Sequence, residues 1–232
     1  MITNSGKRIE NTDSSEKTEK DAEELLLLAK FREKAYLKNP AASTALGLGE
    51  DYAKVGDIYY ENLGDYPKAV DYYKKAVKYY NIVYDGDASN ENGWFLILAY
   101  SKLGWSYYLM DDTDCENALK CFHAEEDILE ELCDAGAGGE YGDIRGYAHV
   151  YYELAEVYRY DNRISAANDM LSKHVSLAEL CLSRYPSDES LEYCTDAVNK
   201  YKEFLQKYKP RNSGKLIDEC TKKLIRLKKT AV

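Results

Sequence analysis

Residues 52–59 read YAKVGDIY, residues 100–107 read YSKLGWSY, and residues 151–158 read YYELAEVY. All three follow one pattern: Tyr, then Val or Leu, then Gly or Ala, then a second Tyr. The four positions are spaced i, i+3, i+4 and i+7, which places them on one face of an α-helix. The small residue lets a second helix approach closely between two aromatic rings. The pattern therefore predicts a helix-packing motif that is used three times, and not a catalytic motif.

The composition favours an all-helical chain. Among 232 residues only 4 are Pro, whereas 23 are Tyr. Ala, Glu, Lys and Leu are abundant, and these residues stabilise helices. The net charge of −10 argues against nucleic acid as the main partner, because binding phosphates requires clustered Lys and Arg.

The sequence also argues against a membrane or secreted protein. No segment approaches the roughly 18–20 consecutive apolar residues that span a bilayer, so we expect no membrane partner. The six cysteines form no CxxC pair and lie within helical patterns, as small hydrophobic residues do in a reducing compartment. We therefore expect a cytoplasmic location.

Apolar periodicity and turn signals divide the chain into about nine helices. We expect a disordered tail over residues 1–18, where no apolar period occurs, and an N-terminal helix over 19–40. We expect residues 19–232 to form a single domain. Its remaining parts are three helix pairs over 43–84, 89–134 and 141–185, a connector rich in Gly that includes Gly136, Gly138 and Gly139, and a final helix pair over 187–230.

The second helix of each pair carries small and bulky residues at matching positions. With the eight-residue motifs, this pattern resembles the tetratricopeptide repeat family. Two departures stand out: the motifs begin at 52, 100 and 151, against a family period of about 34 residues, and Glu125 and His174 occupy positions where a small residue is expected. The matching positions are Ala69, Tyr73 and Ala76; Ala118 and Phe122; and Ala167 and Leu171.

The resemblance implies an all-α fold, a right-handed α-solenoid of antiparallel helix pairs. The long period implies helices of about 20 residues, which span about 30 Å. A solenoid needs terminal elements with a polar outer face. We expect the last two helices to be such a cap and the helix over 19–40 to be its N-terminal counterpart.

The resemblance also implies that the first helix of each pair lines a concave groove that binds a peptide or a partner helix. Lys54 and Glu153 would lie at the edge of this groove. Carboxylates at Asp57 and Glu156 would repel a terminal carboxylate, so a mixed or basic peptide is expected. The predicted groove residues are Asp57, Tyr60, Lys102, Trp105, Tyr108, Tyr152, Glu156 and Arg159.

We expect no catalytic, cofactor or metal site. The chain has no G-x-S-x-G, no Walker sequence and no glycine fingerprint. Cys121 and His123 are two residues apart, so they point to nearly opposite sides of a helix. The acidic run over 125–127 is expected on a solvated helix face.

The function predicted from these features is a non-enzymatic scaffold or adaptor that binds a protein or peptide in its groove. Two alternatives stay open. One is a regulatory subunit, or a segment of a larger signalling or catalytic protein. The other is a phosphopeptide-binding helical protein that uses Lys54, Lys102 and Arg159. Association of the chain with itself is also left open.

Overall fold

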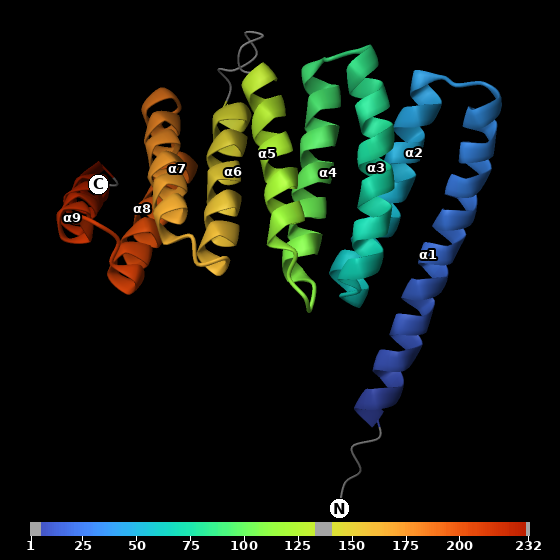
Figure 1. Cartoon of the computed structure of the whole chain (residues 1–232), viewed down its shortest axis with the longest axis horizontal. Helices are drawn as coiled ribbons and strands as arrows, with labels where there is room; N and C mark the ends of the chain where they lie inside the picture. Colours follow the sequence, from blue (N-terminus) through green and yellow to red (C-terminus); the bar gives the residue numbers. More distant parts are fainter. Residues whose placement is uncertain (1–5, 133–140, 231–232) are drawn as a thin grey trace, which may run out of the picture. The chain divides into compact units, whose positions relative to one another are not determined.

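The computed structural model describes residues 6–132 and 141–230. Within these ranges it contains nine α-helices, one short π-helix and no strand (Figure 1), which confirms the all-α fold class. The predicted connector glycines over 136–139 lie outside the described residues. The helices are α1 (Gly6–Lys38), α2 (Ala42–Asp57), the π-helix η1 (Ile58–Leu63), α3 (Tyr66–Gly86), α4 (Asn90–Leu109), α5 (Cys115–Leu132), α6 (Tyr141–Tyr160), α7 (Ile164–Arg184), α8 (Asp188–Tyr208) and α9 (Ser213–Thr230).

The contacts between residues divide the chain into two compact units, Met1–Cys121 and Phe122–Val232. In a helical repeat each helix touches mainly its neighbours along the chain, so few contacts cross any one point. A division of this kind is therefore expected from stacked helices. The single domain over 19–232 remains a prediction.

In the first unit, α2 and α3 pack through the small residue of the first motif. Tyr52, Val55 and Gly56 are all buried. A Cβ atom added at Gly56 would lie 2.7 Å from the Tyr73 ring, and one added at Gly49 would lie 2.5 Å from another ring of α3. The predicted close approach of two helices at the small position is therefore present.

The turn between α2 and α3 follows its sequence signals and adds one unpredicted feature. Gly64 has φ 63°, the left-handed conformation that ends a helix. The Asp65 side chain then accepts a hydrogen bond from the Lys68 backbone N–H at 3.1 Å, and Pro67 lies in the first turn of α3. The last turn before Gly64 is the π-helix η1, which no sequence signal indicated.

Helix α1 packs against α2, η1 and α3 through two polar residues and two small ones. Ala22 and Ala29 are buried. The Arg32 guanidinium donates to the Gly47 carbonyl at 2.6 Å. Glu33 accepts hydrogen bonds from the hydroxyls of two tyrosines, Tyr52 and Tyr79, and the bond from Tyr79 is the main cause that lowers the pKa of Glu33.

The beginning of α1 differs from the sequence prediction. The helix begins at Gly6, whereas the sequence predicted a disordered tail over 1–18. The prediction rested on the absence of an apolar period. That absence removes a buried face but does not prevent polar residues from extending an existing helix, because elongation costs far less than nucleation.

In the second unit, α6 and α7 form the third helix pair. The motif residues Tyr151, Leu154, Ala155 and Tyr158 are all buried, as predicted. Helix α8 begins with a capping box made by Ser187 and Ser190, and α9 packs on α8 with Cys220 buried. The bounds of these helices agree with the predicted ranges to within a few residues.

Two polar residues occupy small-residue positions of this unit in different ways. His174 is buried, and its Nδ1 donates to the Ala148 carbonyl at 2.7 Å. Burial is the main cause that lowers the pKa of His174, so the ring is held in its neutral form. The backbone carbonyl thus supplies the partner that a buried imidazole needs.

Glu125, the second of these polar residues, is buried, so the prediction of a solvated face is wrong for it. Glu125 is only 3% exposed and Glu153 is 0% exposed, although the first was predicted on a solvated face and the second at the groove edge. Burial, and then the charge of Glu153 and a hydrogen bond to it, raises the pKa of Glu125 well above its ordinary value. A protonated Glu125 that donates to Glu153 explains how two carboxyl groups share one interior.

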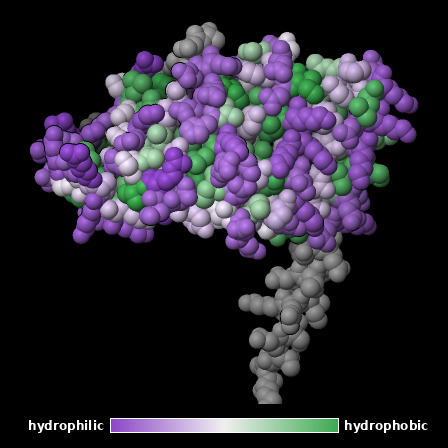
Figure 2. Space-filling model, viewed as in Figure 1, coloured by the Kyte–Doolittle hydropathy of each residue, from purple (hydrophilic) through white to green (hydrophobic). Residues whose placement is uncertain are grey.

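Hydrophilic residues cover most of the face shown in Figure 2, and hydrophobic residues appear mainly in small areas between them. Among the described residues, no helix combines the length and the apolar character that a membrane crossing requires.

Candidate partner-binding surfaces

A pocket in the first unit lies among α2, α3 and α4. Its volume is about 200 Å³. Leu98 on its rim is 59% exposed. The rings of Tyr80 and Phe95 stack with centroids 5.6 Å apart, so much of the lining is apolar. We call this site the first-unit pocket, and its lining residues are Ala53, Asp57, Tyr73, Tyr80, Phe95, Leu98, Ala99 and Lys102.

The cation at the rim of the first-unit pocket is paired with two carboxylates. The Lys102 ammonium lies 3.8 Å from the Asp57 carboxylate and 2.5 Å from that of Glu61. It also lies 5.0 Å from the centre of the Tyr60 ring. Tyr73 donates a hydrogen bond to Asp57 at 2.6 Å, and burial, followed by this bond, raises the pKa of the Tyr73 phenol. Asp57 is therefore engaged on two sides rather than a free repelling charge.

Two aromatic residues of α4 lie one to two turns beyond Lys102. The rings of Trp105 and Tyr108 meet edge to face with centroids 5.4 Å apart. Both side chains are half-buried. They therefore keep part of their aromatic surface accessible for contact with a partner.

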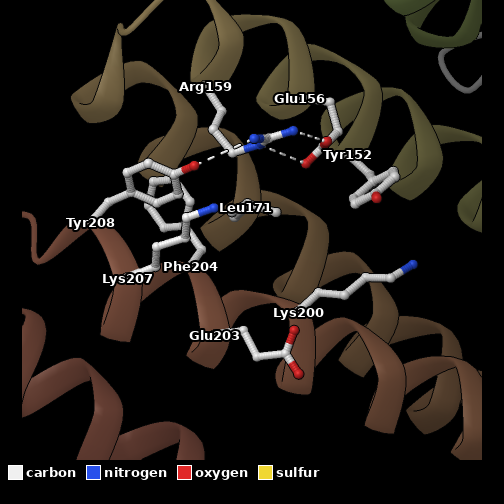
Figure 3. A pocket seen from close by; sticks show the side chains of 9 residues that line it. All are labelled: Tyr152, Glu156, Arg159, Leu171, Lys200, Glu203, Phe204, Lys207 and Tyr208. Atoms are coloured by element: carbon white, nitrogen blue, oxygen red, sulfur yellow. Dashed lines mark hydrogen bonds and ion pairs between the residues drawn. The ribbon is translucent and has the colours of Figure 1, made fainter.

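The second-unit pocket lies among α6, α7 and α8 and has a volume of about 310 Å³ (Figure 3). Leu171 and Phe204 are buried beneath it. Three cations line it against two carboxylates, in a protein whose net charge is −10. The lining residues are Tyr152, Glu156, Arg159, Leu171, Lys200, Glu203, Phe204, Lys207 and Tyr208.

Arg159 joins the two sides of the second-unit pocket. Its guanidinium donates to both carboxylate oxygens of Glu156, at 3.2 and 2.5 Å, and to the Tyr208 hydroxyl at 3.3 Å, as the dashed lines in Figure 3 show. The hydrogen bond from Arg159 is the main cause that lowers the pKa of Tyr208. A guanidinium held by a two-point carboxylate contact is fixed in direction. Arg159 thus sets the shape of the pocket wall.

The two lysines of the second-unit pocket are less constrained. Lys200 lies over the Tyr152 ring at 4.5 Å and pairs with Asp196 on its own helix at 2.9 Å. Lys207 is exposed and makes no ion pair within the described residues, although its ammonium lies 5.1 Å from the Tyr208 ring centre. A ligand can therefore bind Lys207 without breaking an ion pair, unlike Arg159 and Lys200.

The match to a known family also lies in the first helix pair. Residues 54–80 match the family model of the tetratricopeptide repeat. The match covers the end of α2, η1 and most of α3. The resemblance predicted from the sequence is confirmed there.

Several solved structures share the helical arrangement at low similarity. BtubC (BKLC) from P. vanneervenii is 13% identical with a TM-score of 0.47, over 92% of each chain. The DHF119 filament is 17% identical with a TM-score of 0.38, over 88% of this chain and 99% of that one. The designed helical repeat protein DHR64 is 16% identical with a TM-score of 0.30, over 95% and 96%. Sequence identities and TM-scores this low do not indicate a function. No curated protein matches the chain.

Five of the eight predicted groove residues line one of the two pockets, whereas Tyr60, Trp105 and Tyr108 line neither. In the tetratricopeptide repeat, Asp57 lines the first-unit pocket together with Lys102, and Tyr60 contacts Lys102 beside it. The other unit places its three predicted residues in the lining of the second-unit pocket. Whether these residues bind a partner stays a prediction.

Several lining residues were not predicted from the sequence, although the sequence holds a signal for two of them. Phe95 and Leu98 precede Lys102 and Trp105 at spacings of 3, 4 and 3, which is one stripe of a helix. The contribution of α8 had no such signal, because its contact with α6 joins residues far apart in the chain, as in the Arg159–Tyr208 bond.

The cations proposed for phosphopeptide binding are mostly engaged. Lys102 is paired with two carboxylates and Arg159 with one. Lys54 is exposed. Because a phosphate would have to compete with these carboxylates, the structure gives this alternative less support than it gives a peptide ligand.

Proposed function

We propose that this protein is a non-enzymatic scaffold that binds a protein or peptide segment through the first-unit and second-unit pockets. The observation that carries the proposal is the position of the variable motif residues. In each unit some of these residues, which differ from motif to motif, line a pocket with an apolar floor and a charged rim: Asp57 and Lys102 in the first, Tyr152 and Glu156 in the second. Pockets of this make-up suit apolar side chains of a partner, with the charges fixing its register.

The tetratricopeptide repeat over 54–80 supports this proposal at the level of the family, since its repeats generally mediate protein interactions. Fold alone does not specify a partner. The pocket linings carry both signs of charge, so the partner we propose is a segment of mixed charge with exposed apolar residues. A regulatory role within a larger protein is compatible with such binding, but no contact in the described residues favours it.

The proposal is tested by selecting peptides from a random phage-displayed library on the full chain and measuring their affinities. Leu98→Ser in the first-unit pocket and Lys207→Glu in the second-unit pocket are the test variants. Both residues are exposed, so neither change should unfold the protein. Each selected peptide should bind one of them more weakly, by roughly 5- to 30-fold, the usual cost of losing a central contact.

The matched controls are Leu180→Ser on α7 and Lys222→Glu on α9, which are exposed residues of the same types that line neither pocket. These variants should bind with unchanged affinity. Failure to enrich any peptide, or equal weakening by test and control variants, would overturn the proposal.

A further inference from the structure

The exposed face of α1 carries a cluster of apolar residues, whereas that of the last helix is mostly polar. The outward residues of α9 include Asp218, Lys222 and Lys229, which suits a solenoid end that faces water. On α1, Leu27 is 71% exposed and Phe31 is 74% exposed. The prediction that the first helix is a cap like the last one therefore fails in this respect.

Exposed apolar side chains are concentrated on α1. Of the ten large hydrophobic residues exposed in the described parts of the chain, four lie within residues 27–37, while the others are spread over several helices. Hydrophobic residues are visible over this part of α1 at the right edge of Figure 2. Single exposed apolar residues are ordinary, but a cluster of them indicates an interaction site.

The face opposite this cluster is already used within the first unit. Ala22 and Ala29 are buried, and Arg32 and Glu33 bond to α2 and α3. Leu27 and Phe31 are one turn apart and point away from these residues, because a helix turns by about 100° per residue. The helix therefore cannot bury both faces within its own unit.

The charges that flank the cluster are opposite in sign, so they can pair with those of a second copy of the helix. Glu24 precedes Leu27 by three residues and Lys34 follows Phe31 by three, so all four lie on one stripe. Both charged residues are exposed, and neither forms an ion pair within the described residues. In an antiparallel pair of α1 helices centred between Leu27 and Phe31, Glu24 of each copy lies opposite Lys34 of the other. A parallel pair would place like charges together.

We propose that the stripe Glu24–Leu27–Leu28–Phe31–Lys34 of α1 is a homodimer interface that binds the same stripe of a second copy in antiparallel orientation. The pairing is isologous, as in most two-fold dimers. In the same pairing Lys20 of one copy lies opposite Lys38 of the other near the ends of the stripe; both lysines are exposed, so salt screens their repulsion. None of its residues lines either pocket, so the interface can hold two scaffolds together while each binds its own partner.

The proposal is tested by the solution mass of the full chain over a concentration series. A contact between two helices is small, so we expect a Kd on the order of 10 µM. At high concentration the mass should be twice the 26.5 kDa of one chain. Phe31→Glu should give the monomer mass at every concentration, while Ile225→Glu, at an exposed apolar residue of α9, should leave the dimer intact.

A charge exchange tests the orientation. Glu24→Lys alone and Lys34→Glu alone should each weaken the dimer at least tenfold, and the double variant should restore it. Circular dichroism spectra and melting temperatures of all variants control for folding. A wild-type chain that stays monomeric at high concentration, a dimer that survives Phe31→Glu, or a double variant that fails to recover would each overturn the proposal.

Discussion

At the scale of single residues, the spacing of small and bulky side chains was readable from the sequence because packing between helices is local and periodic. Gly56 shows this: its position in the motif predicted a close helix contact, and the Tyr73 ring now fills that space. Glu125 shows the limit. Its acidity suggested a solvated face, and only the facing Glu153 of another helix explains its burial.

Replacing Gly56 by Ala should destabilise the protein, because the new methyl group would meet the Tyr73 ring at 2.7 Å. Overpacking of this kind costs about 1–3 kcal/mol. Urea unfolding measures the loss. The matched control is Gly86→Ala, where no atom lies within 4 Å of the added Cβ; it should be neutral or slightly stabilising. Equal stability of Gly56→Ala and wild type would contradict the packing.

The Glu125–Glu153 pair should make stability depend on pH. The pKa of Glu125 is raised above its ordinary value of 4.5 in the folded state. The folded protein therefore holds a proton that the unfolded chain releases, and the free energy of unfolding falls as pH rises from about 4.5 through the raised pKa. Glu125→Gln, which keeps a hydrogen-bond donor without the titration, should flatten this decline.

Urea unfolding of wild type, Glu125→Gln and the exposed control Glu130→Gln at several pH values above 4.5 checks this expectation. The control should follow wild type. A Gln variant with the same slope as wild type would show that the pair does not carry the shifted proton, because Glu33 and His174 contribute equally to both slopes.

At the scale of elements, turn chemistry predicted most helix ends. Gly64, Asp65 and Pro67 marked the first turn, and the structure places each of them in its expected role. The π-helix η1 was not predictable, because a π-turn inside a helix has no residue signature of its own and depends on tertiary packing. The extension of α1 to Gly6 was missed because periodicity reports only burial, and not helix formation itself.

The turn at Gly64 offers a test at this scale. Its φ of 63° is strained for residues with a Cβ, and nothing lies within 4 Å of the site, so substitution there changes only backbone strain. Gly64→Ala should cost about 1–2 kcal/mol in free energy of unfolding. Gly64→Asn should cost less, since Asn162 and Asn212 already adopt positive φ in this chain. Thermal unfolding of the two variants should preserve this order; the reverse order would contradict a left-handed helix end.

At the scale of the molecule, the repeated motif predicted a helical-repeat fold, and the predicted groove residues make up two of the eight lining residues of the first-unit pocket and three of the nine of the second-unit pocket. The rest of each lining comes from neighbouring helices, such as α8 with Lys207 and Tyr208, whose contacts no local pattern encodes. The apolar stripe of α1 was also missed, because Leu25–Leu28 form a continuous run that does not show which residues face outward.

The central claim is that partners bind at the pockets formed by the variable motif positions. Hydrogen–deuterium exchange of the full chain, with and without a selected peptide, tests it most directly. The peptide should slow exchange in α4 for the first-unit pocket, or in α6 and α8 for the second-unit pocket, while α9 stays unchanged. Slower exchange confined to other helices, with neither pocket affected, would contradict it.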